Sequence, residues 1–171
     1  MGSYGAALRK WDLPNLGTSV SWHANGMSQH YSATSATTAA MFPQGVPIFV
    51  RGGDTPRWLS AAKEALNVLL ALPAGWNSYA AKQIDIAVVK DTMELLSAAM
   101  DDNATRLPTI VPVSNGGVLL EWQTADADLE AIVLPSGRVK LLFERVGAQT
   151  IEQEFLTQEA YAVVRELLRS F

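Results

Sequence analysis

The chain has 171 residues, of which 49% are hydrophobic and 18% are charged. This length leaves room for one domain with a buried core, or one domain plus a long arm, and the composition is typical of a globular protein. The formal net charge is -4, so no overall positive field attracts nucleic-acid phosphates. Cysteine is absent, which excludes disulfides, thiolate metal sites and cysteine nucleophiles.

No targeting or membrane segment is expected from the sequence. The richest apolar stretch, residues 65–74, is interrupted by Asn67 and Pro73 and is shorter than the roughly 18 to 20 residues that cross a bilayer. Arg9 and Lys10 are not followed by the apolar block of a secretory signal. We therefore expect a cytoplasmic protein that does not bind membranes.

Charge divides the chain into two parts. Residues 1–50 carry only Arg9, Lys10 and Asp12, whereas charged residues are frequent in the remainder. We predict a low-charge arm rich in Ser, Thr and Ala at residues 1–53, followed by an α+β domain at residues 54–171. Inside the arm, the low-complexity stretch around residues 32–40 offers little large apolar surface to bury.

Two short elements are predicted inside the arm. Asn25-Gly26 supplies the positive φ values of a type I′ turn, which is compatible with a small hairpin between the apolar residues on either side. The apolar piece at residues 46–50 contains Pro47 and precedes two glycines, which suits an edge strand or an extended arm better than a central strand.

The domain begins with two helical patterns. Thr55 and Pro56 are a typical cap and first residue of a helix, and apolar residues then recur at helical spacing until Pro73 stops the run. Asp85 is predicted to cap a second helix with one apolar stripe that must be buried. This stripe consists of Ile86, Val89, Met93, Leu96 and Met100.

From residue 109 the apolar period changes to two, which indicates antiparallel strands in a meander. The strands are expected at 110–113, 118–123, 129–134 and 139–144, with a fifth and weaker strand at 150–155. Thr157 is predicted to cap a last helix, with Leu156 and Tyr161 as a hydrophobic staple. This order predicts an α+β fold, in which two preceding helices and one C-terminal helix cover one face of an antiparallel meander of four to five strands.

Two segments of the domain share a pattern with known proteins. The first is Leu72-Pro73-Ala74-Gly75-Trp76-Asn77-Ser78-Tyr79-Ala80-Ala81-Lys82-Gln83-Ile84, and the second is the hairpin Gly116-Gly117-Val118-Leu119-Leu120-Glu121-Trp122. They resemble a widespread group of small, uncharacterised bacterial proteins with the patterns Leu-Pro-x-Gly-Trp-Asp-x-Tyr-Gly-Ala-x-x-Ile and Gly-Gly-x-x-Leu-Glu-Trp. The resemblance covers residues 57–145 and implies a shared fold and a bacterial or phage origin, but no activity.

The chain departs from this pattern at Asn77, where the group usually has aspartate, and at Ser78 and Ala80, where glycine is frequent. An amide cannot act as a base or bind a hard cation strongly, so a chemical role of the aspartate would be lost. A structural role would survive, because asparagine can form the same local turn hydrogen bonds.

Seven aromatic residues are candidates for binding a partner. Five lie in the arm, which is too apolar for a solvated linker and is therefore expected to bury its side chains by docking. These five are Trp11, Trp22, Tyr31, Phe42 and Phe49. Trp76 and Tyr79 lie between the two helices, where they either hold a partner or plug the end of the helix layer against the sheet, and the second interpretation is favoured. Trp122 is expected in the core.

Catalytic and metal sites have weaker support in the sequence. Glu121 and Glu130 are expected to face each other on neighbouring strands, with Asp126 and Asp128 nearby, and paired carboxylates can hold a metal or divide acid and base roles. The same residues also suit the solvated face of a sheet. His23 and His30 lack the third and fourth ligands of a zinc site, and no nucleophile elbow or phosphate-binding loop occurs. We therefore expect no catalytic residue, no metal and no cofactor.

The sequence thus favours a non-catalytic protein-interaction module of bacterial or phage origin, in which the arm wraps another protein or a second copy of the chain. Its size and charge suit a toxin–antitoxin, defence or counter-defence system, an association drawn from the resemblance. Two alternatives stay open. One is a metal-dependent hydrolase that uses Glu121, Asp128 and Glu130; the other is a nucleic-acid-binding protein that uses Arg138, Lys140 and Arg145 with Trp76 or Tyr79.

Overall fold

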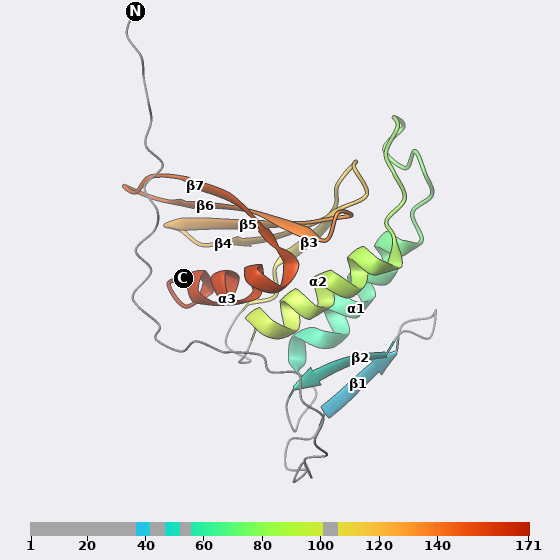
Figure 1. Ribbon diagram of the computed structural model, residues 1–171, viewed down its shortest axis with the longest axis horizontal. Coiled ribbons are helices and arrows are strands. Elements are labelled where there is room, and N and C mark those ends of the chain that lie inside the picture. The colour runs from blue at the N-terminus through green and yellow to red at the C-terminus, as the bar shows by residue number, and fades with distance from the viewer. Residues whose placement is uncertain (1–36, 42–46, 52–55, 101–105) are drawn as a thin grey trace, which may run out of the picture. The chain divides into compact units, whose positions relative to one another are not determined.

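The computed structural model describes residues 37–41, 47–51, 56–100 and 106–171 (Figure 1). All of them belong to one compact unit, residues 33–171. The hairpin predicted around Asn25-Gly26 lies outside the described residues. The predicted division of the chain between residues 53 and 54 stays a prediction.

Two short strands precede the first helix. Strand β1 (Thr37–Met41) and strand β2 (Pro47–Arg51) pair antiparallel in a two-stranded sheet, with Met41 opposite Pro47. The predicted edge strand is thereby confirmed, since both strands of such a sheet are edges and tolerate proline. Strand β1 was not predicted. Its sequence, Thr-Thr-Ala-Ala-Met, has no alternation of large apolar and polar residues from which a strand could be inferred.

Helix α1 (Arg57–Leu70) forms where the sequence predicts the first helix, and its apolar stripe is buried. The predicted start differs by one residue, because Pro56 occupies the cap position and the helix begins at Arg57. Thr55 lies outside the described residues. The helix ends three residues before Pro73, whose ring is incompatible with a continuing helix.

Helix α2 (Ile86–Ala99) starts as predicted, with the Asp85 carboxylate accepting a hydrogen bond of 2.8 Å from the amide of Ala87. Its buried surface is wider than the single predicted stripe, because the helix contacts α1 and the sheet as well as the C-terminal helix. The buried residues are Val88, Val89, Thr92, Met93, Leu95, Leu96 and Ala99. The hydroxyl of Thr92 donates to the Val88 carbonyl over 2.7 Å, which satisfies the one polar side chain of this surface.

A five-stranded antiparallel meander follows, with the strands in the order β3-β4-β5-β6-β7. They are β3 (Thr109–Pro112), β4 (Val118–Gln123), β5 (Ala127–Leu134), β6 (Arg138–Arg145) and β7 (Ile151–Leu156). At the start of β4 only glycine fits, because a Cβ on Gly117 would lie 2.7 Å from the carbonyl oxygen of Val133 on β5. The meander predicted from the sequence is confirmed, including its fifth strand.

Helix α3 (Thr157–Leu168) corrects the predicted cap. Leu156 occupies the cap position and Thr157 the first turn, where its hydroxyl is buried without a partner among the described residues. The start of the helix is marked instead by Glu159, whose carboxylate accepts a hydrogen bond of 3.2 Å from the amide of Leu156. Because Leu156 is the cap itself and is exposed, the predicted staple with Tyr161 is wrong.

The helices α1, α2 and α3 lie on one side of the meander (Figure 1), and alternate strand residues point into the core that they enclose. Leu120, Leu129 and Leu141 are buried there, as is Trp122, whose indole N–H donates to the Arg106 carbonyl over 3.1 Å. The predicted α+β fold is therefore confirmed. None of the described helices is long and apolar enough to cross a bilayer.

Replacing Leu120 by alanine should lower the free energy of unfolding by about 2 to 5 kcal/mol, because the side chain is 0% exposed and its loss leaves a cavity. Urea denaturation of the full chain measures this loss. The matched control is Val68→Ala on α1, where the valine is 60% exposed, and its effect should stay within about 0.5 kcal/mol. Equal losses in the two variants would contradict the assignment of the core.

Candidate functional site

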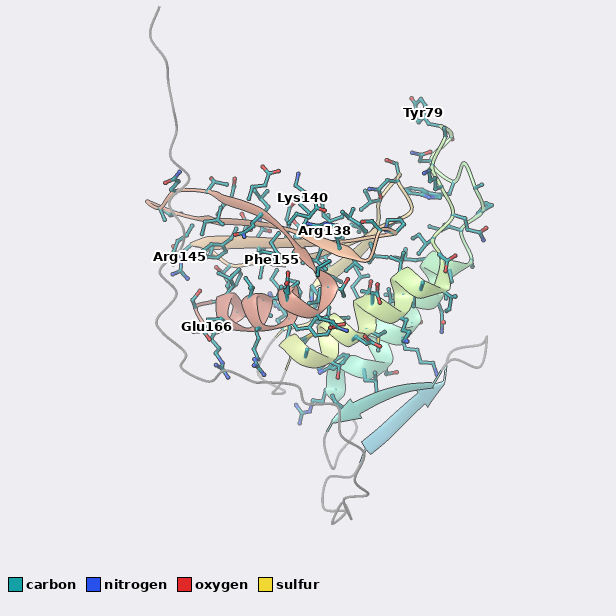
Figure 2. All side chains as sticks on the ribbon, in the orientation of Figure 1. Tyr79, Arg138, Lys140, Arg145, Phe155 and Glu166 are labelled. Carbon is teal, nitrogen blue, oxygen red and sulfur yellow. The ribbon has the colours of Figure 1, made fainter. Side chains whose placement is uncertain are left out.

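The loop between α1 and α2, residues 71–85, projects beyond the helices and carries Tyr79 at its tip (Figure 2). The side chain of Tyr79 is 83% exposed, the highest value among the exposed large hydrophobic residues of the described chain. The sequence-based interpretation that Tyr79 plugs the helix layer is therefore wrong. Gly75 and Asn77 build the turn that leads to this residue, and their turn preference is the sequence signal that could have placed Tyr79 at a tip.

Backbone hydrogen bonds connect the residues of the loop to one another and to the sheet. The amide of Gly75 donates to the Ala81 carbonyl over 2.7 Å, and the amide of Ser78 donates to the Gly75 carbonyl over 2.9 Å. The base of the loop is fixed to the turn between β3 and β4, because the amide of Lys82 donates to the Ser114 carbonyl over 2.9 Å. Tyr79 is thus an exposed aromatic side chain on an ordered support.

Asn77 forms the local turn hydrogen bond that the sequence predicts for it. Its side-chain oxygen accepts a hydrogen bond of 3.0 Å from the amide of Tyr79, an interaction that an aspartate would make equally well. Ser78 has a φ of 64°, in the left-handed region that favours glycine. This conformation explains why glycine is suited to the position at which the chain has serine.

Trp76 differs from Tyr79 in its surroundings. The residue is half-buried, and its indole nitrogen is buried without a hydrogen-bond partner among the described residues. Trp76 therefore contributes to the support of the loop, whereas Tyr79 is the aromatic side chain available to another molecule.

The sheet has a second surface, which we call the open face: the side of the meander turned away from the three helices. Lys140 points to this side, whereas Phe155 lies toward α3 (Figure 2). No element of the described chain covers the open face. Five aliphatic residues of this face are half-buried by their neighbours. They are Val111, Leu119, Ile132, Leu134 and Leu142.

The basic residues proposed for nucleic-acid binding do not form one patch. On the open face Lys140 pairs with Glu152 and Arg138 pairs with Glu154, both across the β6–β7 ladder. A hydrogen bond from Lys140 to the Glu152 carboxylate, together with the negative charge of that group, raises the pKa of the Lys140 ammonium. Arg145 lies at the other end of β6 (Figure 2), where its guanidinium stacks 5.6 Å from the centre of the Phe143 ring.

The carboxylates predicted to face each other do so. Glu121 on β4 is directly opposite Glu130 on β5, and Asp128 on β5 is directly opposite Glu144 on β6. Asp126 lies in the turn between β4 and β5 instead. The described residues contain no group of three or more acidic or histidine side chains that could hold a metal ion, so the geometry provides paired carboxylates without a ligand set.

The strongest electrostatic perturbations lie elsewhere, where α2 meets α3. The Tyr161 hydroxyl donates to the Glu94 carboxylate over 3.0 Å, and burial, followed by the charge of Glu94, raises the pKa of that hydroxyl far above its usual range. Burial and the charge of Glu94 also raise the pKa of Asp91. A phenol that keeps its proton at neutral pH is a poor base and a poor nucleophile, so this contact joins two helices and provides no reactive group.

The remaining predicted residues belong to the arm. Phe49 is in strand β2, opposite Ala39. The other four aromatic candidates lie outside the described residues, as do both histidines. These residues are Trp11, Trp22, Tyr31, Phe42, His23 and His30. Their assigned role in docking stays a prediction.

Comparison with known proteins finds no family model, no curated protein and no solved structure that matches the chain. The functional argument therefore depends on the geometry of this molecule.

Replacing Asn77 by alanine should speed the hydrogen exchange of the Tyr79 amide and lower the free energy of unfolding by about 0.5 to 1.5 kcal/mol, because the amide loses its acceptor. The control is Asn77→Asp, which keeps an acceptor oxygen and should behave as the wild type does. NMR hydrogen exchange and urea denaturation measure both quantities. If Asn77→Asp weakens the loop as much as Asn77→Ala does, the proposed role of the turn hydrogen bond is wrong.

Replacing Asp91 by asparagine should stabilise the protein at pH 7 by about 0.2 to 0.5 kcal/mol, because it removes a carboxylate whose ionised form is disfavoured by burial and by the like charge of Glu94 on α2. The pKa of Asp91 is higher in the folded chain than its usual value of 3.8. Ionisation of Asp91 therefore lowers the free energy of unfolding as the pH rises from 3.8 to the pKa of the folded chain. The gain from Asp91→Asn should therefore disappear below pH 3.8.

Urea denaturation of wild type and variant across this pH range tests the expectation. Glu64→Gln, an exposed position on α1, serves as the control and should give no such pH-dependent difference. A gain from Asp91→Asn that persists at the lowest pH would contradict the electrostatic explanation.

Proposed function

We propose that this protein is a non-catalytic protein-interaction module that presents Tyr79 to a partner protein. The observation that carries the proposal is an aromatic side chain, 83% exposed, at the tip of a loop that several backbone hydrogen bonds and one side-chain hydrogen bond hold in place. Tyrosine is one of the residues that most often dominates the binding energy of protein interfaces.

The order of the loop supports a binding role for energetic reasons. A side chain on a flexible loop loses conformational entropy when it binds, which reduces affinity. The hydrogen bonds of Gly75, Ser78 and Lys82 remove much of that loss before the partner arrives. Tyr79 itself has few rotatable bonds and a large contact area, so it offers affinity at a low entropic penalty.

A non-catalytic role is supported by the chemistry of the described side chains. The paired carboxylates of β4 and β5 belong to no group of three acidic or histidine side chains that could hold a metal ion in the described part of the chain, and the Tyr161 hydroxyl keeps its proton at neutral pH. The basic residues Lys140 and Arg138 are engaged by glutamates, which disfavours phosphate binding. The hydrolase and the nucleic-acid-binding protein are therefore the less favoured alternatives.

The biological setting is part of the same proposal. We infer a cytoplasmic protein of bacterial or phage origin that acts as a subunit of a complex, in a toxin–antitoxin, defence or counter-defence system. The sequence resemblance and the small size support this inference. The partner is another protein or a second copy of the chain, and residues 1–53 are proposed to add to the contact.

Replacing Tyr79 by alanine should reduce the amount of copurified partner at least tenfold, because a hot-spot aromatic residue contributes about 2 kcal/mol or more to binding. The full tagged chain is purified under native conditions from its own host, and the copurified proteins are quantified by mass spectrometry. Tyr79→Phe should retain most of the binding, since the ring remains. Val146→Ala is the control, because Val146 is also apolar and 79% exposed but lies in the β6–β7 turn.

The outcome that would overturn the proposal is equally definite. If Tyr79→Ala copurifies the same proteins at the same level as the wild type and Val146→Ala do, Tyr79 does not bind a partner. Circular dichroism and urea denaturation should confirm that all three variants remain folded, which separates a lost contact from a lost fold.

A further inference from the structure

We propose that the open face of the sheet binds a cationic amphipathic segment of a partner protein. Apolar residues of that segment would cover the aliphatic row of β3, β4 and β5, and its Lys or Arg residues would bind the carboxylates beside that row. The inference rests on the proposed function only in taking the occupant to be a protein; it uses a different surface from Tyr79.

The aliphatic row runs directly across three strands. Val111 on β3 is opposite Leu119 on β4, and Leu119 is opposite Ile132 on β5. Neighbouring strands are about 4.8 Å apart, so these three side chains form one continuous apolar strip. On β6 the residue opposite Ile132 is Lys140, so the strip ends at β5; Leu134 lies two residues farther along β5, and Leu142 on β6 is opposite Glu130. In the described chain no helix or strand covers this strip, and its residues are half-buried by their neighbours in the sheet.

Negative charge lies beside the strip in two consecutive cross-strand pairs. The pairs are Glu121 with Glu130, and Asp128 with Glu144. Like charges directly opposite each other on neighbouring strands destabilise a sheet. None of these four carboxylates forms an ion pair with a described residue; only Glu130 is close enough to Lys140 to help raise the pKa of that ammonium.

On the half of the open face formed by β6 and β7, acidic side chains are neutralised by basic side chains of the same sheet. Glu152 and Glu154 on β7 are paired with Lys140 and Arg138 on β6. The uncompensated charge is therefore confined to β4, β5 and the end of β6, next to the aliphatic strip.

Charge complementarity selects the class of occupant. A Lys or Arg residue bound between two facing carboxylates removes their repulsion and forms charge-assisted hydrogen bonds. A nucleic acid or an anionic membrane would instead be repelled. A metal ion alone would leave the aliphatic strip exposed, and the described residues hold no group of three ligands for it. A segment with both apolar and cationic residues matches both halves of the surface.

The test is an NMR titration of the full chain with a synthetic peptide in which Lys and Leu alternate over twelve residues. The backbone amides of Val111, Leu119, Ile132 and Leu142 should shift, and binding should weaken steeply as the salt concentration rises. A peptide of alternating Glu and Leu should cause no shifts at these positions. Saturating binding with a fitted Kd is required in the titration with the cationic peptide.

The double variant Glu121→Gln with Glu130→Gln should raise the Kd for the cationic peptide at least tenfold. It should also unfold at a higher urea concentration than the wild type, because the repulsion between the two carboxylates is gone. The control is Glu64→Gln with Glu166→Gln, two exposed positions on α1 and α3. It makes the same change in net charge and should leave the Kd within about twofold of the wild-type value.

Three outcomes would overturn the inference. The first is an equal rise of the Kd in both double variants, which would mean non-specific attraction by net charge. The second is a set of shifts outside the open face. The third is concentration-dependent self-association that Leu119→Lys abolishes, which would make a second copy of the chain the occupant. Loss of this inference would leave Tyr79-dependent copurification intact, so the two proposals fail separately.

Discussion

The structure depends on the burial of alternate residues of the meander against the three helices. Because a strand turns successive side chains to opposite faces, Leu120, Leu129 and Leu141 can reach the helices only if their neighbours point away from them. The two-residue period therefore creates the core and the open face together. A shift of the register by one residue would place carboxylates against α2, which is why the hairpin turns and Gly117 define the surface as well as the fold.

Much of this arrangement could be predicted from the sequence, because it follows from local patterns. The strands alternate, the turns contain glycine, and Asp85 is followed at once by a helical apolar pattern, so the α+β order and the facing of Glu121 and Glu130 could be derived. Strand β1 could not, because its small residues carry no period. The start of α3 was misplaced by one residue for a related reason: Thr157 is a good cap by type, but the hydrogen bond from the Leu156 amide to the Glu159 carboxylate marks the position of the cap.

The candidate sites also differ in how far local sequence patterns predict them. The turn preference of Gly75 and Asn77 indicates a tip near Tyr79, but how far the loop projects depends on contacts between residues distant in sequence, such as Lys82 and Ser114, which no local pattern contains. The ion pairs of Lys140 and Arg138 required the fifth strand in its observed register, since the glutamates that neutralise them come from β7. Without that strand the basic residues resemble a free patch, and with it the unneutralised carboxylates of β4 and β5 become the distinctive charge of the surface.

The hydrogen bond between the Lys82 amide and the Ser114 carbonyl joins the two segments that carry the sequence pattern, although 31 residues separate them along the chain. Helix α2 and the connection to β3 lie between these two residues along the chain, and the hydrogen bond brings their ends together. The turn of the hairpin, which contains Ser114, supports the base of the tyrosine loop through this hydrogen bond. A substitution in the hairpin turn would therefore change the support of the loop and, with it, the orientation of the Tyr79 side chain.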